Sequence, residues 1–216
     1  MSINKLKLGL ACLVLVFVSS NAWAGWLENI YLHEDVGVAF VQNIESGPFG
    51  DKLSFSPGVQ GGIGIGGNIN KSLSTEFQTG IIWNQVDKIG FGGTWHNPDL
   101  YGQTMELYQF PLLLNCIYTV PDNSAFKPYW GVGLGGVVSY FSEKVYGGIA
   151  KDSDADFTFA YQVMAGLKYE FSPHAQIGIG YKFFGSLNHN WYLFGTDTKA
   201  DPVYTHLVSV SFIWKF

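Results

Sequence analysis

A serine and two histidines stand near the end of the chain, in a stretch where nucleophilic chemistry is conceivable. Ser186 and His189 are three residues apart, and His206 follows after a polar segment. A histidine that accepts the hydroxyl proton turns serine into a nucleophile, and an acidic residue commonly orients that histidine. Spacing alone does not establish the hydrogen bonds that a triad needs. A hydrolase is therefore an alternative hypothesis, and we predict no catalytic residues.

Acidic residues could in principle hold a metal ion. Asp152, Asp154 and Asp156 occupy alternate positions, and Glu143 precedes them. Carboxylate oxygens are the ligands that Ca²⁺ prefers. However, Phe157 stands where a calcium loop needs its tight-turn glycine, and no glutamate takes the closing position. The sequence favours a solvated acidic loop, and we predict neither a metal nor another cofactor.

Two glycine-rich stretches match the pattern G-x-G-x-x-G of dinucleotide-binding proteins, at Gly62–Gly67 and Gly131–Gly136. That motif holds a pyrophosphate when a strand precedes it and a helix N-terminus follows it. Here the glycines alternate with apolar residues inside what reads as continuous β-strands. They are better explained as positions that leave room for neighbouring inward side chains.

Composition narrows the class of protein. The chain has 216 residues, a net charge of −5, 47% hydrophobic residues, 17% aromatic residues and 27 glycines. Only 13% of its residues are charged, about half the share usual in a soluble domain. All 12 basic residues are lysines. A nucleic-acid-binding protein usually presents a basic surface, often with arginine, so nucleic acid is excluded as a partner.

Residues 1–24 have the features of a cleaved signal peptide. Lys5 and Lys7 give a positive start, and Leu8–Val18 is an apolar run too short to span a membrane as a helix. Ala22-Trp23-Ala24 then fits a cleavage site, so the mature domain is expected to cover residues 25–216. Later apolar runs also fall short of a spanning helix. A closed β-barrel is the other structure that can cross a bilayer with its backbone groups paired.

The candidate residues discussed above must be positioned by β-strands, and the clearest of these is a long amphipathic strand. From Asp156 to Phe171 the odd positions are all apolar, with aromatic residues at both ends and aliphatic residues between them. The even positions are small or polar. This period of two indicates a strand with one apolar face. On that face the aromatic residues match the two membrane interfaces, and the aliphatic residues between them match the hydrocarbon core.

The same pattern recurs along the chain and predicts an all-β, transmembrane, antiparallel up-and-down β-barrel of about eight strands. The predicted strands are Leu32–Gln42, Gly58–Ile69, a third that ends near Asn84, Glu106–Val120, Phe126–Phe141, Asp156–Phe171, Ala175–Gly185 and Thr205–Phe216. Pro111 cannot donate to a strand ladder, so we expect a bulge or a local break there.

The connections alternate between long and short. We expect polar loops at Asn43–Ser56, Gln85–Thr104, Ser142–Asp156 and Ser186–Tyr204. Tight turns are expected between the other strands, which places both mature ends on the short-turn side. In an outer-membrane barrel that side is the periplasm.

Inward positions carry a set of polar residues. An eight-stranded interior is about wide enough to be filled by side chains, so a buried polar network that plugs the lumen is favoured over an ion pathway. The residues predicted for this network are Glu76, Gln78, Gln162, Lys168, Glu170 and Lys182.

The chain resembles the eight-stranded outer-membrane barrels of Gram-negative bacteria, the OmpA-like, OmpX-like and opacity-protein group. Phe126–Gly136, Phe157–Tyr169 and the terminal residue Phe216 carry the resemblance. Trp214 and Phe216 fit the last positions of that group's assembly signal, although Phe212 stands where glycine is often found. The resemblance implies location in the cell outer membrane, contact with its lipids and lipopolysaccharide, and delivery by periplasmic chaperones and the barrel-assembly machinery.

The resemblance also implies a non-enzymatic protein that supports the envelope and displays its loops for adhesion or another surface interaction. Trp95, Trp191, Tyr192 and Phe194 are the loop residues expected to contact a partner, such as a host surface molecule, or to anchor the loops in headgroups. One alternative is a rim-located hydrolase of lipid A or phospholipid. The stretch around Ser186 is faintly similar to lipid A deacylases, but Phe184 stands where their histidine belongs. The other alternative is a narrow channel or a transporter of small apolar solutes.

Overall fold

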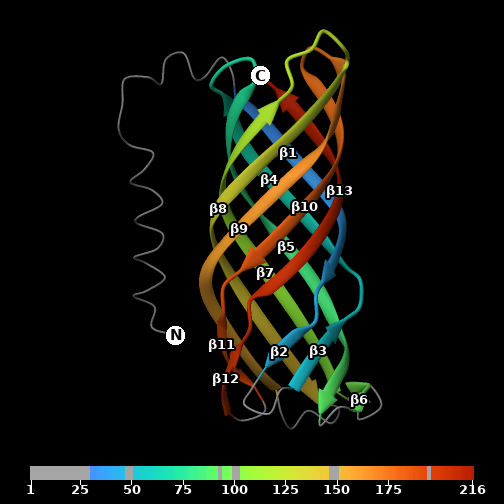
Figure 1. Ribbon diagram of the computed structural model, residues 1–216, viewed down its shortest axis with the longest axis vertical. Helices are drawn as coiled ribbons and strands as arrows, with labels where there is room; N and C mark the ends of the chain where they lie inside the picture. Colours follow the sequence, from blue (N-terminus) through green and yellow to red (C-terminus); the bar gives the residue numbers. More distant parts are fainter. Residues whose placement is uncertain (1–29, 47–50, 92–93, 99–102, 146–150, 194–195) are drawn as a thin grey trace, which may run out of the picture.

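The computed structural model describes residues 30–46, 51–91, 94–98, 103–145, 151–193 and 196–216, and these segments are almost entirely antiparallel β-structure (Figure 1). Within them, eight long strands form a closed ring, because β1 pairs with β4 on one side and with β13 on the other. The barrel strands are β1 (Ile30–Val41), β4 (Gly58–Asn68), β5 (Leu73–Phe91), β7 (Gln103–Thr119), β8 (Phe126–Val145), β9 (Lys151–Ser172), β10 (Ala175–Ser186) and β13 (Val203–Lys215). The predicted antiparallel barrel of about eight strands is confirmed.

The two ends of the barrel differ. Short connections at residues 69–72, 120–125 and 173–174 lie at one end, which we call the turn end. The chain's last residue is also there, because the Phe216 amide donates a hydrogen bond to the Ile30 carbonyl at the start of β1. Figure 1 shows this end at the top, with the C-terminus. The opposite end, called the loop end, carries the long connections.

The loop end contains more β-structure than the sequence predicted. Segments expected to be polar loops form five additional strands, drawn at the bottom of Figure 1. These are β2 (Ile44–Ser46), β3 (Asp51–Phe55), β6 (Thr94–His96), β11 (His189–Leu193) and β12 (Thr196–Ala200). β5, β8 and β9 also continue past their predicted ends. The physical reason is a shared apolar core: Ile44, Leu53 and Trp191 are each almost completely buried there.

The barrel strands have the predicted faces. On β1, Val36 and Phe40 are exposed while Ala39 is buried. The same alternation holds on β13 and on the other barrel strands. The outward set is mainly apolar, as a lipid-facing surface requires. In the described part of the chain, no helix is long and apolar enough to cross a membrane. The predicted signal peptide lies outside the described residues.

Pro111 interrupts one ladder without changing its register. Pairing between β5 and β7 stops after Thr79–Leu112 and resumes at Ile82–Gln109, while pairing of β7 with β8 continues through Pro111. Proline has no amide hydrogen to donate toward β5. Instead, the Thr79 hydroxyl donates to the Pro111 carbonyl at 2.9 Å. The expected local break is therefore present on the β5 side.

Candidate functional site

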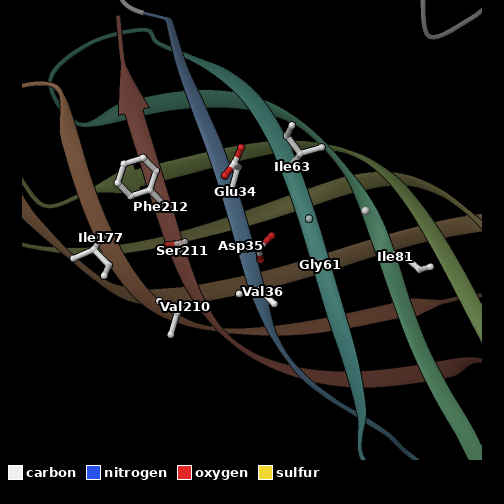
Figure 2. A pocket seen from close by; sticks show the side chains of 12 residues that line it. Glu34, Asp35, Val36, Gly61, Ile63, Ile81, Ile177, Val210, Ser211 and Phe212 are labelled. Atoms are coloured by element: carbon white, nitrogen blue, oxygen red, sulfur yellow. The ribbon is translucent and has the colours of Figure 1, made fainter.

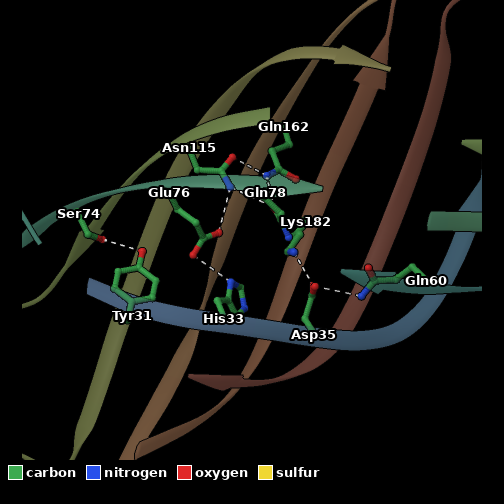
Figure 3. A network of polar contacts seen from close by, with 10 residues as sticks. All are labelled: Tyr31, His33, Asp35, Gln60, Ser74, Glu76, Gln78, Asn115, Gln162 and Lys182. Carbon is green, nitrogen blue, oxygen red and sulfur yellow. Dashed lines mark hydrogen bonds and ion pairs between the residues drawn. The ribbon is translucent and has the colours of Figure 1, made fainter. Parts of the chain in front are cut away.

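A network of buried polar side chains crosses the barrel interior (Figure 3). The Asn115 amide donates to Glu76 at 3.2 Å and to Gln78 at 3.0 Å. The Gln162 amide donates to Gln78 at 2.9 Å and to Asn115 at 2.7 Å. His33 lies 3.1 Å from the second oxygen of Glu76. The structure thus brings together three residues of the sequence-based list, Glu76, Gln78 and Gln162, and joins them through Asn115.

A second polar group lies beside the first. The Lys182 ammonium donates to the Asp35 carboxylate at 2.5 Å, and the Gln60 amide donates to the same oxygen at 3.2 Å. All three side chains are buried. A buried lysine and a buried aspartate stabilise each other's charge when no water reaches them.

Asp35 and His33 are absent from the sequence-based network. A usable signal existed, since both residues have the same parity on β1 as Ala39 and Val41, which are buried inside the barrel. Following that alternation back to His33, within the predicted strand Leu32–Gln42, would have found them. Asn115 also has inward parity on β7, but nothing in the sequence marks it as the link between two glutamines and a glutamate.

Lys168 and Glu170 lie apart from the main network. The Lys168 ammonium sits over the Tyr129 ring, 4.6 Å from its centroid. Glu170 is nearer the turn end, where it accepts hydrogen bonds from Gln176 at 3.3 Å and from Lys215 at 3.4 Å. The six predicted residues are therefore distributed over several levels of the lumen.

Gly133 shows how a strand glycine makes room for this network. A Cβ atom added at Gly133 would lie 2.1 Å from the Asn115 side-chain oxygen and 2.9 Å from Gln162. Gly131–Gly136 lies within β8, and Gly62–Gly67 lies within β4. The glycine-rich stretches are thus parts of the barrel wall, without the strand–turn–helix context of a dinucleotide site.

Apolar side chains fill the lumen between the network and the loop end. One buried cluster contains Ala39, Ile82, Leu113, Val137, Ala160, Phe184 and Leu207. A larger one lies at the loop end and contains Val41, Ile44, Leu53, Val86, Ile89, Met105, Leu107, Phe141, Trp191, Ala200 and Val203. Together with the polar network they occupy three successive levels of the interior.

A Ser–His–Asp arrangement lies under the β11–β12 hairpin. The Ser186 hydroxyl is 2.9 Å from His189 Nε2, and His189 Nδ1 is 3.4 Å from an Asp156 carboxylate oxygen. Ser139 is also 3.5 Å from Nε2. Burial lowers the pKa of His189 to about 4, and the nearby Asp156 carboxylate opposes that shift only in part. The imidazole is therefore neutral at neutral pH.

The Ser–His–Asp arrangement differs from an open active site in its accessibility. Ser186 and His189 are both completely buried, and the His189 ring stacks on the Trp191 ring at 4.6 Å between centroids. The Asp156 carboxylate also accepts a hydrogen bond from the Asn190 backbone amide. In this conformation the three residues tie β9, β10 and β11 together. His206, the other histidine considered, lies apart on β13 beside Tyr181.

The acidic residues considered for calcium have separate partners. Asp156 faces His189, and the Asp154 carboxylate accepts from the Ala155 amide at 2.8 Å. The side chain of Asp152 lies outside the described part of the structure. Among the described side chains, no group of three or more histidines, cysteines or acids has the geometry of a metal site.

The loop aromatics are placed differently from one another. Trp95 on β6 is 45% exposed, as a contact residue would be. Trp191 is 1% exposed and packs on Phe141, so the expectation that its ring is displayed by a loop is wrong. The reason is that the hairpin folds its apolar side onto the loop-end core. Tyr192 belongs to β11, but its side chain is outside the described set, as is Phe194.

The residues of the predicted assembly signal, Trp214 and Phe216, are exposed on the outer face at the turn end. Phe212 joins them there and stacks against Trp214. Their outward position is compatible with contact to another protein during assembly. Recognition by the assembly machinery stays a prediction.

Comparisons with solved structures find the same fold. Neisserial surface protein A is 18% identical, with 87% of this chain and 97% of that chain covered and a TM-score of 0.57. The outer membrane protein OprG from Pseudomonas aeruginosa is 16% identical, with 88% and 97% covered and a TM-score of 0.54. The outer membrane protease OmpT from Escherichia coli is 9% identical, with 88% and 97% covered and a TM-score of 0.53. No curated protein matches the sequence.

Because the identities are low, these neighbours establish the fold of this chain but not its function. A family model covers nearly all of the chain and carries the assignment further. The model for the outer membrane protein beta-barrel domain matches residues 10–216, so the chain belongs to this family and is a protein of the cell outer membrane.

Proposed function

We propose that this protein is a non-enzymatic, non-conducting outer-membrane barrel that supports the envelope and presents a structured platform at the cell surface for adhesion or recognition. The observation that carries the proposal is the loop end. A strand needs about 9–11 residues to cross an outer membrane, whereas β8 has 20 residues and β9 has 22. With the short turns in the periplasm, this excess projects outward.

The projecting part has a core of its own. Its apolar cluster includes Ile44 and Leu53 from the β2–β3 hairpin, Ile89 from β5 and Trp191 from β11. Such packing holds the platform in one shape, which lowers the entropy lost when it binds a partner. Trp95 is exposed on this platform, and exposed aromatic rings are frequent at recognition surfaces.

Filling of the lumen supports the non-conducting part of the proposal. Phe184 and Leu113 are each 1% exposed in the middle cluster, with the polar network on one side and the loop-end core on the other. Recordings from planar bilayers that contain the purified protein should show no discrete conductance steps. Reproducible steps that scale with protein concentration would support the channel alternative instead.

The surface-recognition part needs a separate test. Cells that display the protein should adhere to host epithelial layers more strongly than cells without it, and Trp95→Ala should reduce this adhesion. Phe216→Ala at the turn end is a poor control, since it touches the predicted assembly signal. Lys88→Ala is a better one because Lys88 is exposed at the same end. Equal adhesion with and without the protein would contradict the proposal.

A hydrolase is the second candidate, because Ser186, His189 and Asp156 have the order of contacts found in serine hydrolases. The complete burial of Ser186 and His189 favours the structural role instead. A fluorophosphonate probe, which modifies activated serines, should leave the folded protein unlabelled. Labelling that is lost in Ser186→Ala, together with turnover of labelled lipid A or phospholipid, would establish the enzyme.

A further inference from the structure

Glu34 on β1 is a charged residue that points outward, toward the lipid. Glu34 is exposed on the outer, lipid-facing side of the barrel, between the apolar residues Leu32 and Val36 of its own strand. Across the ladders it is paired with Ile63 on β4 and with Phe212 on β13. No described residue forms a hydrogen bond or ion pair with its carboxylate. A charged side chain at membrane depth is costly, and such residues commonly mark functional sites.

Glu34 lies in the periplasmic half of the apolar band. It is four residues from Ile30 at the turn end, or about 13 Å along the strand. With the strand tilted by about 40°, its height is roughly 10 Å in an apolar band about 25 Å tall. Trp214 is paired with Leu32, one outward position closer to the periplasm, and tryptophan is typical of the headgroup level. The carboxylate is therefore within reach of headgroups of the inner leaflet.

The outer wall is hollowed beside Glu34 (Figure 2). A groove of about 610 Å³ runs over β1, β4, β5, β10 and β13, and its outward side chains include Val36, Ile63, Ile81, Ile177, Val210 and Phe212. Gly61 forms part of its floor: it is paired with Val36 and Ile81, and a Cβ added there would meet nothing within 4 Å. The outward side chains of the groove are therefore apolar apart from Glu34, and the inward residues Asp35 and Ser211 complete its lining.

We propose that this groove is a binding site for a phospholipid with a primary ammonium headgroup, such as phosphatidylethanolamine. The acyl chain would lie over Gly61 between Val36 and Ile81. The ammonium would pair with Glu34, for which a charge-assisted hydrogen bond in a poorly hydrated setting is favourable. An anionic phospholipid without an ammonium group would bring like charge toward the carboxylate and would bind less well.

Two observations favour a lipid over a second copy of this chain. In a two-fold symmetric dimer over this groove, the same patch would face itself, so one Glu34 would approach the other. Nor do Lys182 on β10 and Lys215 on β13 offer a counter-charge, because Lys182 is buried with Asp35 and Lys215 is paired with Glu170. The ammonium group of a zwitterionic phospholipid supplies the missing positive charge and brings no second Glu34 toward the first.

The test uses the purified protein in nanodiscs that contain equal amounts of phosphatidylethanolamine and phosphatidylglycerol with identical acyl chains. Native mass spectrometry then counts the lipids that stay bound after release. We expect the wild type to retain phosphatidylethanolamine at least threefold more often than phosphatidylglycerol. Glu34→Gln should lower that ratio to about one. Gly61→Leu, which fills the groove floor, should reduce retention of both lipids.

Glu106→Gln is the matched control. Glu106 is also a carboxylate on the outer face, but it lies toward the loop end and pairs with Lys144 at 2.8 Å, so the wild-type ratio should persist. Heat-modifiable migration on gels shows that each variant is folded, and Glu34→Ala replaces Glu34→Gln if the latter fails this check. Equal retention of the two lipids by the wild type, or an unchanged ratio in Glu34→Gln, overturns the proposal. A lipid-free dimer also overturns it and assigns the groove to a second copy.

Discussion

Asp35 on β1 and Lys182 on β10 form an ion pair inside the barrel, although 147 positions separate them in the chain. Both side chains are almost completely buried, at 1% and 3% exposure. Closure of the barrel makes the contact possible, because only β13 lies between β1 and β10 in the closed sheet. One Asp35 oxygen carries two hydrogen bonds, whereas its other oxygen is buried without a partner. The pair is therefore sensitive to the loss of either member.

Replacing Lys182 with methionine should destabilise the barrel strongly. The substitution keeps most of the side-chain volume but leaves Asp35 buried with Gln60 as its remaining partner, which typically costs about 3–5 kcal/mol. Urea unfolding in lipid vesicles, followed by tryptophan fluorescence, measures the change. The double variant Asp35→Leu/Lys182→Met should recover most of the loss, since it removes both charges.

The exposed pair of Lys52 and Glu45 provides the control for this experiment. Its atoms are 2.6 Å apart, but both side chains are about half exposed. Solvent screens such pairs, so Lys52→Met should change the unfolding curve little. A similar loss of unfolding free energy in Lys182→Met and Lys52→Met would mean that burial does not make the interior pair more important than the exposed one.

Adding one methyl group at Gly133 should disturb the polar network. In Gly133→Ala the new Cβ would overlap the Asn115 oxygen, and the Asn115–Gln162 hydrogen bond would have to break or shift. We expect a loss of about 1–3 kcal/mol in unfolding free energy. Gly61→Ala on β4 is the matched variant, because the new methyl group there meets open space and stability should be unchanged. Equal effects at the two glycines would contradict the packing argument.

The sequence predicted the barrel because the bilayer and the lumen make opposite demands on successive residues. Each strand must alternate, so the faces of Val36, Ile63 and Phe212 could be read without knowing any tertiary contact. Partner choice in the lumen could not be read in this way. That Lys182 meets Asp35 depends on the register of every ladder around the ring, and a slip of two residues in one of them preserves the alternation.

The loop end was mispredicted for a related reason. Ile44, Leu53 and Trp191 are separated by glycines, charges and polar residues, so no local period marks them as parts of strands. Their burial comes from long-range packing in one shared core. The contact of Asp156 with His189 was equally hidden, because the sequence placed Asp156 where an acidic loop meets the strand Asp156–Phe171 and His189 in a different loop.

Removing the largest side chain of the middle apolar cluster should weaken the fold without opening a pore. Phe184→Ala creates a cavity in a fully buried position and should cost about 3–5 kcal/mol. Conductance in planar bilayers should nevertheless stay absent, because the polar network and the loop-end core still fill the levels on either side. Conductance steps in Phe184→Ala would show that a single layer closes the lumen.

Acid should loosen the hairpin of β11 and β12 through His189. Its folded pKa is about 4, below the ordinary value near 6.5, because burial disfavours the charged imidazole. Between these two values the opened state binds the proton and the closed state does not, so stability falls as pH falls from about 6.5 to about 4. The loss is at most about 1.4 kcal/mol for each pH unit in this window. Below pH 4 the effect should level off.

Hydrogen exchange of the β11 amides measures this opening at pH 7 and pH 5, after division by the rates of an unstructured peptide of the same sequence. Protection should decrease at pH 5 in the wild type. His189→Gln retains a partner for Ser186 but cannot titrate, so its protection should be the same at both pH values. His206→Gln removes the histidine beside Tyr181 on β13 and should behave like the wild type. If His189→Gln kept the wild-type pH dependence, His189 would not be the group that loosens the hairpin in acid.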